Sequence, residues 1–119
     1  MSQIRRVLVA DDQQPTQHGL HALLDLLPGV EWVGEASNGR EAVSLTLEKR
    51  ADVVLMDVRM PEMDGLEAMR LIKGQRPEVK VIVLTIHGDY RQEALAAGAD
   101  VFLVKGGHPG HLRETICTV

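Results

Sequence analysis

The sequence predicts an α/β domain in which a parallel, doubly wound five-stranded sheet is covered by helices on both faces. Two observations predict this fold class. Short apolar runs recur along the chain, and longer segments with helical periodicity separate them. The central runs are continuously apolar, a pattern typical of parallel strands that are buried on both faces. Right-handed crossovers are expected between successive strands.

Five segments are predicted to form the strands. Four of them are short apolar runs at 7–10 (VLVA), 53–56 (VVLM), 81–84 (VIVL) and 101–104 (VFLV). The fifth segment, 30–36 (VEWVGEA), mixes charged with apolar side chains. We therefore expect this segment at an edge of the sheet.

The first helix is expected between two prolines. Pro15 suits the first position of a helix, which would make Gln14 the cap, and Pro28 follows the helix end. The apolar residues at one-face spacing are Leu20, Leu23, Leu24 and Leu27. We expect this stripe to pack against the sheet.

Capping signals mark the starts of the next three helices. In a capping box, an Asn, Asp, Ser or Thr cap is followed three residues later by Glu or Gln. The matching pairs are Asn38 with Glu41, Asp64 with Glu67, and Asp89 with Gln92. Gly98 is expected to cap the C-terminus of the fourth helix. A fifth helix is expected from near Pro109 to Val119.

Length and composition predict one domain that spans residues 1–119. The net charge of -4 and the pI near 5.7 argue against direct binding to nucleic acid or to an anionic membrane, since both need a basic face. The single cysteine, Cys117, excludes an internal disulfide. No segment resembles a signal peptide or a membrane span, so we expect a reduced, cytoplasmic protein.

Polar residues follow the central strands directly. They are Asp11 and Asp12, then Asp57, Thr85 and Lys105. Because parallel strands end at the same edge of a sheet, where open α/β folds bind ligands, these side chains are expected to converge. Three neighbouring carboxylates favour a hard divalent cation such as Mg²⁺, whereas an ammonium and a hydroxyl suit phosphoryl oxygens. The pattern predicts metal-assisted phosphoryl transfer, with a carboxylate as nucleophile or metal ligand.

The motifs resemble the receiver domain of bacterial two-component response regulators, of the NarL/LuxR-type subgroup. The resemblance covers the whole chain and rests on VADDQ, LMDVRMPEMDG, VLT and AGADVFLVK. It implies a flavodoxin-like receiver fold with strand order 2-1-3-4-5. It also implies a signalling switch, not an enzyme, that is phosphorylated by a sensor histidine kinase in a Mg²⁺-dependent reaction.

The resemblance also assigns roles to the acidic residues. Asp57 would accept the phosphoryl group. Asp12 and Asp57 would hold Mg²⁺ directly, together with the backbone carbonyl of Arg59. Asp11 would act on the metal mainly through water.

The resemblance also assigns roles in switching and in the lifetime of the phosphoryl group. Thr85 and Lys105 would sense the phosphoryl group, and Phe102 would be the switch aromatic that turns inward as Thr85 moves. Arg59 and His87, each two residues after a site residue, would tune how long the phosphoryl group persists.

An enzymatic function is the alternative to the signalling switch. A small phosphohydrolase of the haloacid dehalogenase type also places aspartates, threonine and lysine along a sheet edge, but it opens with an aspartate pair separated by one residue. Here adjacent acids come first and Asp57 follows. The switch would act by forming a homodimer on phosphorylation, or on DNA through an output domain outside this chain.

Overall fold

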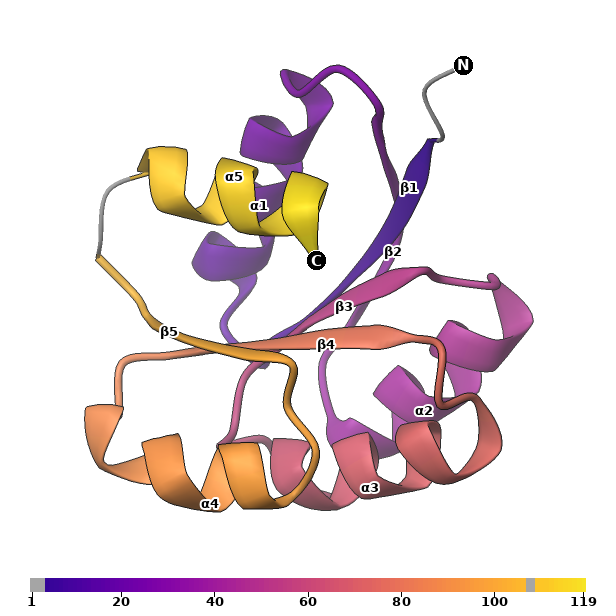
Figure 1. The fold of residues 1–119 in the computed structure, drawn as a ribbon, viewed down its shortest axis with the longest axis vertical. Coiled ribbons are helices and arrows are strands. Elements are labelled where there is room, and N and C mark those ends of the chain that lie inside the picture. Colours follow the sequence, from indigo (N-terminus) through magenta and orange to yellow (C-terminus); the bar gives the residue numbers. More distant parts are fainter. Residues whose placement is uncertain (1–3, 107–108) are drawn as a thin grey trace.

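A computed structural model describes residues 4–106 and 109–119. The chain folds into a five-stranded parallel sheet with helices on both faces (Figure 1). The strand order is β2-β1-β3-β4-β5. The predicted fold class and strand order are both confirmed.

The strands are β1 (Arg5–Ala10), β2 (Val30–Ala36), β3 (Val53–Met56), β4 (Lys80–Thr85) and β5 (Val101–Val104). β2 lies at an edge of the sheet, as its mixed composition predicts. β5 lies at the other edge, and Val104 is 48% exposed. The prediction that the apolar run at 101–104 is buried on both faces is wrong. This run forms the edge strand β5, and the helices do not cover its last residue.

The helices form two layers. α1 (Gln14–Asp25) and α5 (Pro109–Thr118) cover one face of the sheet, and α2 (Gly39–Glu48), α3 (Gly65–Gln75) and α4 (Arg91–Ala96) cover the other (Figure 1). A short 3₁₀ helix, η1 (Gly88–Tyr90), precedes α4. Within the described ranges, no helix has both the length and the apolar content needed to cross a membrane.

Two hydrophobic clusters, one on each face, form the core. Along β1, Val7 and Val9 pack toward α1 and α5, whereas Leu8 packs toward α2, α3 and α4. This alternation explains why the strand runs are continuously apolar. The predicted stripe on α1 is confirmed, since Leu24 is fully buried and its three neighbours in the stripe pack against the same cluster.

Of the three caps predicted from capping-box pairs, two are confirmed. The Asn38 side chain accepts a hydrogen bond from the Glu41 backbone N–H at 2.8 Å. The Asp64 side chain accepts one from the Glu67 N–H at 2.9 Å. Each cap thus satisfies a donor in the first turn of its helix.

Two predicted helix starts are wrong. α1 is capped by Gln13 instead of Gln14, which places Pro15 second in the helix, where a missing N–H is still tolerated. Asp89 does not cap a helix. Instead, Tyr90 donates its backbone N–H to the His87 carbonyl at 3.2 Å, and this bond closes the 3₁₀ turn before α4 begins.

Two glycines, at the starts of α2 and α3, hold the loop between β3 and α3 in place. Gly65 donates its N–H to the Val58 carbonyl at 2.7 Å, and Gly39 donates to the Met63 carbonyl at 2.9 Å. A Cβ atom at Gly65 would overlap the carbonyl oxygen of Asp57, and one at Gly39 would overlap that of Met63. Close backbone approach therefore fixes the position of Asp57.

Gly65→Ala is expected to lower the free energy of unfolding by about 1–3 kcal/mol, because the new methyl group must push the Asp57 backbone away. Gly74→Ala, in the same helix, is the matched control, since its Cβ would meet nothing within 4 Å. Alanine there should leave stability unchanged or raise it by up to about 1 kcal/mol. Urea unfolding measures both variants, and equal stabilities would contradict the packing argument.

Candidate functional site

The predicted site residues gather at the carboxyl edge of the sheet. Asp11 follows β1, Asp57 follows β3, Thr85 ends β4, and Lys105 follows β5. The Lys105 N–H donates to the Thr85 carbonyl at 2.8 Å, which extends the pairing of β4 and β5 by one residue. The chain therefore brings these four positions together from four different strands.

Three carboxylates form an acidic cluster at this edge. Asp11, Asp12 and Asp57 each offer an oxygen atom that lies within 4.8 Å of the others. Asp11 and Asp57 are 2% and 8% exposed, whereas Asp12 is exposed. A donor set of carboxylate oxygens fits a hard divalent cation of the Mg²⁺ type, because such ions prefer oxygen ligands and neutralise the repulsion among the acids.

The Lys105 ammonium lies between two of these carboxylates. Its Nζ atom is 2.5 Å from Asp11 Oδ2 and 3.1 Å from Asp57 Oδ2, and its side chain is 16% exposed. Removing three charges from water is costly, and mutual pairing offsets much of that cost. The ammonium thus supplies the positive charge that two buried carboxylates need.

The pKa shifts of Asp11 and Lys105 show how burial and charge pairing compete at this site. Burial raises the pKa of Asp11 above its ordinary value, although the hydrogen bonds from Lys105 and the Gln13 N–H act in the opposite direction. Burial alone would lower the pKa of Lys105, but its contacts with Asp11 and Asp57 outweigh burial and raise it. The lysine therefore stays charged, and the acidic cluster remains only partly compensated.

Backbone groups fix the two buried carboxylates. The Val58 N–H donates to Asp57 Oδ1 at 2.8 Å, and the Gln13 N–H donates to Asp11 Oδ1 at 2.8 Å. Asp57 also donates its own N–H to the Ala10 carbonyl at 2.9 Å. One oxygen of each carboxylate is thereby held by the backbone, while the other faces Lys105.

Gln17 supports this edge and was missed by the sequence analysis. It lies on α1, is 2% exposed, and donates its side-chain amide to the carbonyls of Asp11 and Ala36 and to Ser37 Oγ. These bonds join α1 to the ends of β1 and β2. Its spacing could have predicted its burial, because Gln17 lies three residues before Leu20 on the helix face that packs toward the sheet.

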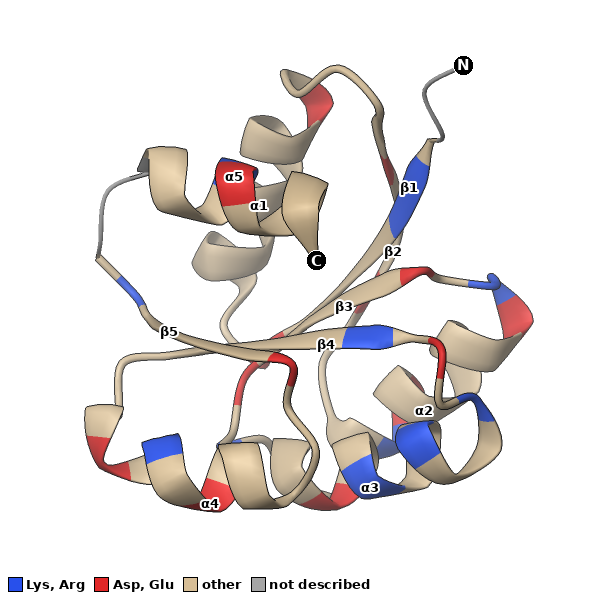
Figure 2. Cartoon of the chain, in the orientation of Figure 1, with Lys and Arg blue, Asp and Glu red and all other residues tan. Residues whose placement is uncertain are grey.

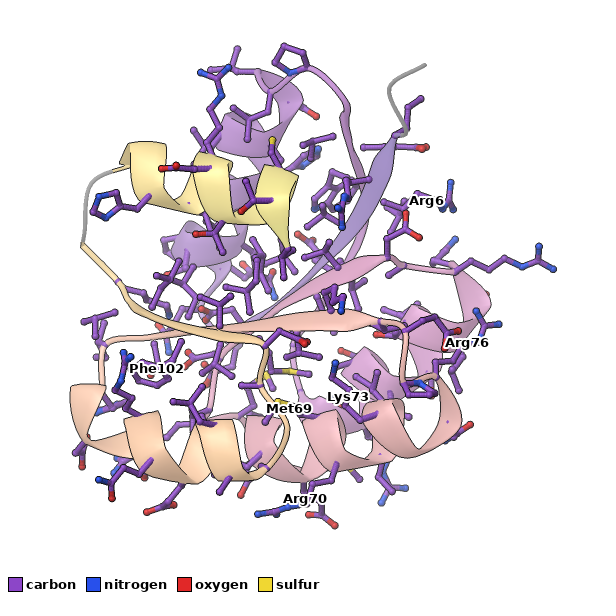
Figure 3. All side chains as sticks on the ribbon, viewed as in Figure 1. Arg6, Met69, Arg70, Lys73, Arg76 and Phe102 are labelled. Atoms are coloured by element: carbon purple, nitrogen blue, oxygen red, sulfur yellow. The ribbon has the colours of Figure 1, made fainter. Side chains whose placement is uncertain are left out.

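Thr85 and Phe102 both lie inside the protein. Thr85 is fully buried, and its hydroxyl oxygen accepts a hydrogen bond from the His87 N–H at 3.2 Å. Phe102 is 6% exposed and packs in the cluster between the sheet and α4 (Figure 3). The Phe102 side chain is therefore already turned inward in this structure, which is the position that the switch was expected to give it.

Arg59 and His87 meet at Tyr90, a residue to which the sequence analysis gave no role. Arg59 Nε donates to the Tyr90 hydroxyl at 3.2 Å, and the guanidinium carbon lies 5.7 Å from the centre of the Tyr90 ring. The His87 ring meets that ring edge-on, with centroids 6.0 Å apart. Within the described part of the chain, no hydrogen bond or ion pair joins Arg59 to Asp57.

Comparison with known proteins agrees with the geometry. Residues 7–117 match the response regulator receiver domain family. The chain is 40% identical over 113 residues to the transcriptional regulatory protein LiaR of Bacillus subtilis (strain 168), covering 93% of this chain and 54% of LiaR. It is 39% identical over 115 residues to the response regulator UvrY of Escherichia coli (strain K12), covering 95% and 53%. The chain thus spans about half the length of the curated relatives it matches.

Solved structures show the same fold. The response regulator domain of Thermotoga maritima CheB is 33% identical, with a TM-score of 0.88 over 96% of this chain and 94% of that domain. A two-component response regulator of the LuxR family from Aurantimonas sp. SI85-9A1 is 30% identical, with a TM-score of 0.89 over 95% and 82%.

Lys105→Ala is expected to tighten Mg²⁺ binding, because the ammonium that now neutralises Asp11 and Asp57 repels an incoming cation. Removing a repulsion of about 1 kcal/mol between the ammonium and the cation should lower the dissociation constant for Mg²⁺ roughly three- to tenfold. Calorimetric titration with Mg²⁺ measures the change. Lys80→Ala, at the opposite end of β4, is the control for net charge and should bind as the wild type does.

Unchanged or weaker Mg²⁺ binding by Lys105→Ala would show that the ammonium does not compete for this site.

Proposed function

We propose that this chain, which belongs to the response regulator receiver domain family, is a two-component signalling switch that carries its phosphoryl group on Asp57. The observation that carries this assignment is the place of Asp57. It follows the central strand, one of its oxygens is held by a backbone N–H, and the other faces an ammonium. That leaves an oriented carboxylate at the edge of the sheet.

In the proposed reaction, the donor is a phosphohistidine of a sensor histidine kinase, the general partner of receiver domains. A carboxylate oxygen of Asp57 forms a bond to phosphorus while the bond from phosphorus to the histidine nitrogen breaks, and that nitrogen keeps the electron pair. The Val58 N–H holds the carboxylate orientation for this attack. Water later attacks phosphorus, the bond from phosphorus to the carboxylate oxygen breaks, and inorganic phosphate leaves the regenerated Asp57 carboxylate.

Mg²⁺, when bound at the acidic cluster, supplies positive charge between the carboxylates and the phosphoryl oxygens. We assign its direct ligands to Asp12, Asp57 and the Arg59 carbonyl. Asp12 suits this role because no described residue bonds to its exposed carboxylate. Asp11 is assigned a role through water, because Lys105 lies closer to its carboxylate (2.5 Å) than to that of Asp57 (3.1 Å) and Asp11 is the more buried of the two.

The proposed switch starts from Lys105 and Thr85. A phosphoryl group adds about -1.5 to -2 charges, which attracts the Lys105 ammonium away from Asp11 and gives the Thr85 hydroxyl a new acceptor. The backbones of these two residues are hydrogen-bonded, so their movements are coupled to the end of β5. The expected output of the switch is the surface of α4 and β5, beneath which Phe102 lies buried.

The family assignment decides against the haloacid dehalogenase alternative and makes the chain a receiver domain instead of a hydrolytic enzyme. We further propose that it regulates transcription, as its relatives' names state for them, through a homodimer or an attached output domain. Direct DNA binding by residues 1–119 is not proposed, because Lys and Arg residues are dispersed among acidic ones over the described chain (Figure 2). The proposal includes a cytoplasmic location.

Asp57→Asn should abolish phosphorylation by acetyl phosphate with Mg²⁺, because an amide is not a nucleophile toward phosphorus. Intact-mass spectrometry of the wild type and the variant measures the phosphoryl adduct directly. Asp52→Asn, on an exposed loop residue before β3, is the matched control and should be phosphorylated as the wild type is. An undiminished adduct on Asp57→Asn would refute the assignment.

Lys105→Ala should still accept a phosphoryl group but fail to pass the signal on, because the metal ligands remain while the sensing charge is lost. The resonances of Phe102 measure the response by NMR before and after phosphorylation. In the variant they should keep the unphosphorylated pattern. A response equal to that of the wild type would assign the sensing role elsewhere.

A further inference from the structure

Tyr90 connects the loop after β3 to the start of α4. Its hydroxyl accepts the hydrogen bond from Arg59, its ring lies beneath the Arg59 guanidinium, and the His87 ring meets it edge-on. Arg59 lies two residues after Asp57, and His87 lies two residues after Thr85. Tyr90 therefore joins the two chain segments that follow the proposed acceptor and the proposed sensing hydroxyl.

The backbone of Tyr90 belongs to the junction between η1 and α4. It is the last residue of η1 and the N-cap of α4, and its side chain packs against the core cluster beneath α4. The contacts of this ring therefore help to position the first turn of α4.

α4 depends on tertiary contacts for its position. It has six residues, no side chain caps its N-terminus, and Ala94 is its only buried residue. Helices this short are not stable by themselves. Arg91 lies 6.0 Å above the Phe102 ring, so the start of α4 is held by Arg59 on one side and by β5 on the other.

The contact between Arg59 and Tyr90 is one that a phosphoryl group can break. Arg59 is exposed, and its partner is a neutral phenol. A phosphoryl group offers a guanidinium several charged acceptors, which form stronger hydrogen bonds than a neutral oxygen does. A doubly charged group on Asp57 therefore competes with Tyr90 for the same guanidinium.

We propose that Tyr90 is a positioning residue that holds Arg59 away from Asp57 in the unphosphorylated chain and loses it to the phosphoryl group. This inference rests on the proposed phosphorylation of Asp57. It adds a second connection from the acceptor to α4, separate from the one through Thr85 and Lys105. It also makes Tyr90 a determinant of phosphoryl lifetime, since it competes for the guanidinium that shields the phosphoryl group from water.

The test is a double-mutant cycle on phosphoryl lifetime. Wild type, Tyr90→Phe, Arg59→Ala and the double variant are phosphorylated with acetyl phosphate and Mg²⁺, and loss of the adduct is followed by intact mass after the donor is removed. Tyr90→Phe keeps the ring and its packing but removes the hydroxyl acceptor. It should lengthen the lifetime roughly two- to fivefold, as expected for one hydrogen bond that no longer competes for Arg59.

Arg59→Ala should shorten the lifetime several-fold, and adding Tyr90→Phe to it should change nothing further. A merely structural role for the hydroxyl would not depend on Arg59, so an equal effect of Tyr90→Phe in both backgrounds would overturn the proposal. An unchanged lifetime in Tyr90→Phe would do the same. If the wild type forms no adduct at Asp57, the proposed function fails and this inference fails with it.

A second readout addresses α4 itself. In the wild type, phosphorylation should shift the backbone amide resonances of Gln92 and Glu93, because Arg59 leaves Tyr90. In Arg59→Ala the contact is already absent, so those shifts should be smaller on phosphorylation. Equal shifts in both proteins would overturn the link from Arg59 to α4.

Discussion

The structure depends on one electrostatic constraint, which is that two carboxylates lie buried at the end of an apolar sheet. Asp11 follows the buried residues 7–10 at the end of β1, and Asp57 follows β3, which is buried throughout. Lys105 reaches them from the edge strand, and backbone N–H groups take the remaining oxygens. Because one ammonium balances two buried carboxylates, the site favours binding of a further cation and responds strongly to added negative charge.

The two sides of this site are held very differently. On one side, the loop after Asp57 is fixed by close backbone contacts at Gly65 and Gly39, and Gln17 secures the backbone of Asp11. On the other side, α4 is short, and Val104 at the end of β5 is exposed. Rigid support suits the bond-forming groups, and weakly held elements suit a change of shape.

The sequence was informative where structure is determined locally. Strand runs could be recognised because both faces of the sheet are covered, and the caps at Asn38 and Asp64 lie within a single turn. The fourth helix start was missed because its 3₁₀ turn at Tyr90 packs against the core. Gln17 was missed because glutamine is usually a surface residue. The side chains of Arg59 and His87 could not be placed, since their shared partner is set by tertiary folding.

The division of the core into two clusters has a consequence for how such domains diversify. Side chains of α1 and α5 pack with one set of strand residues, and those of α2, α3 and α4 pack with the alternate set. Substitutions in one layer are therefore expected to combine additively with those in the other. Evolution can remodel the outer surface of α1 and α5 for new binding partners while the layer that contains Phe102 and α4 keeps its packing.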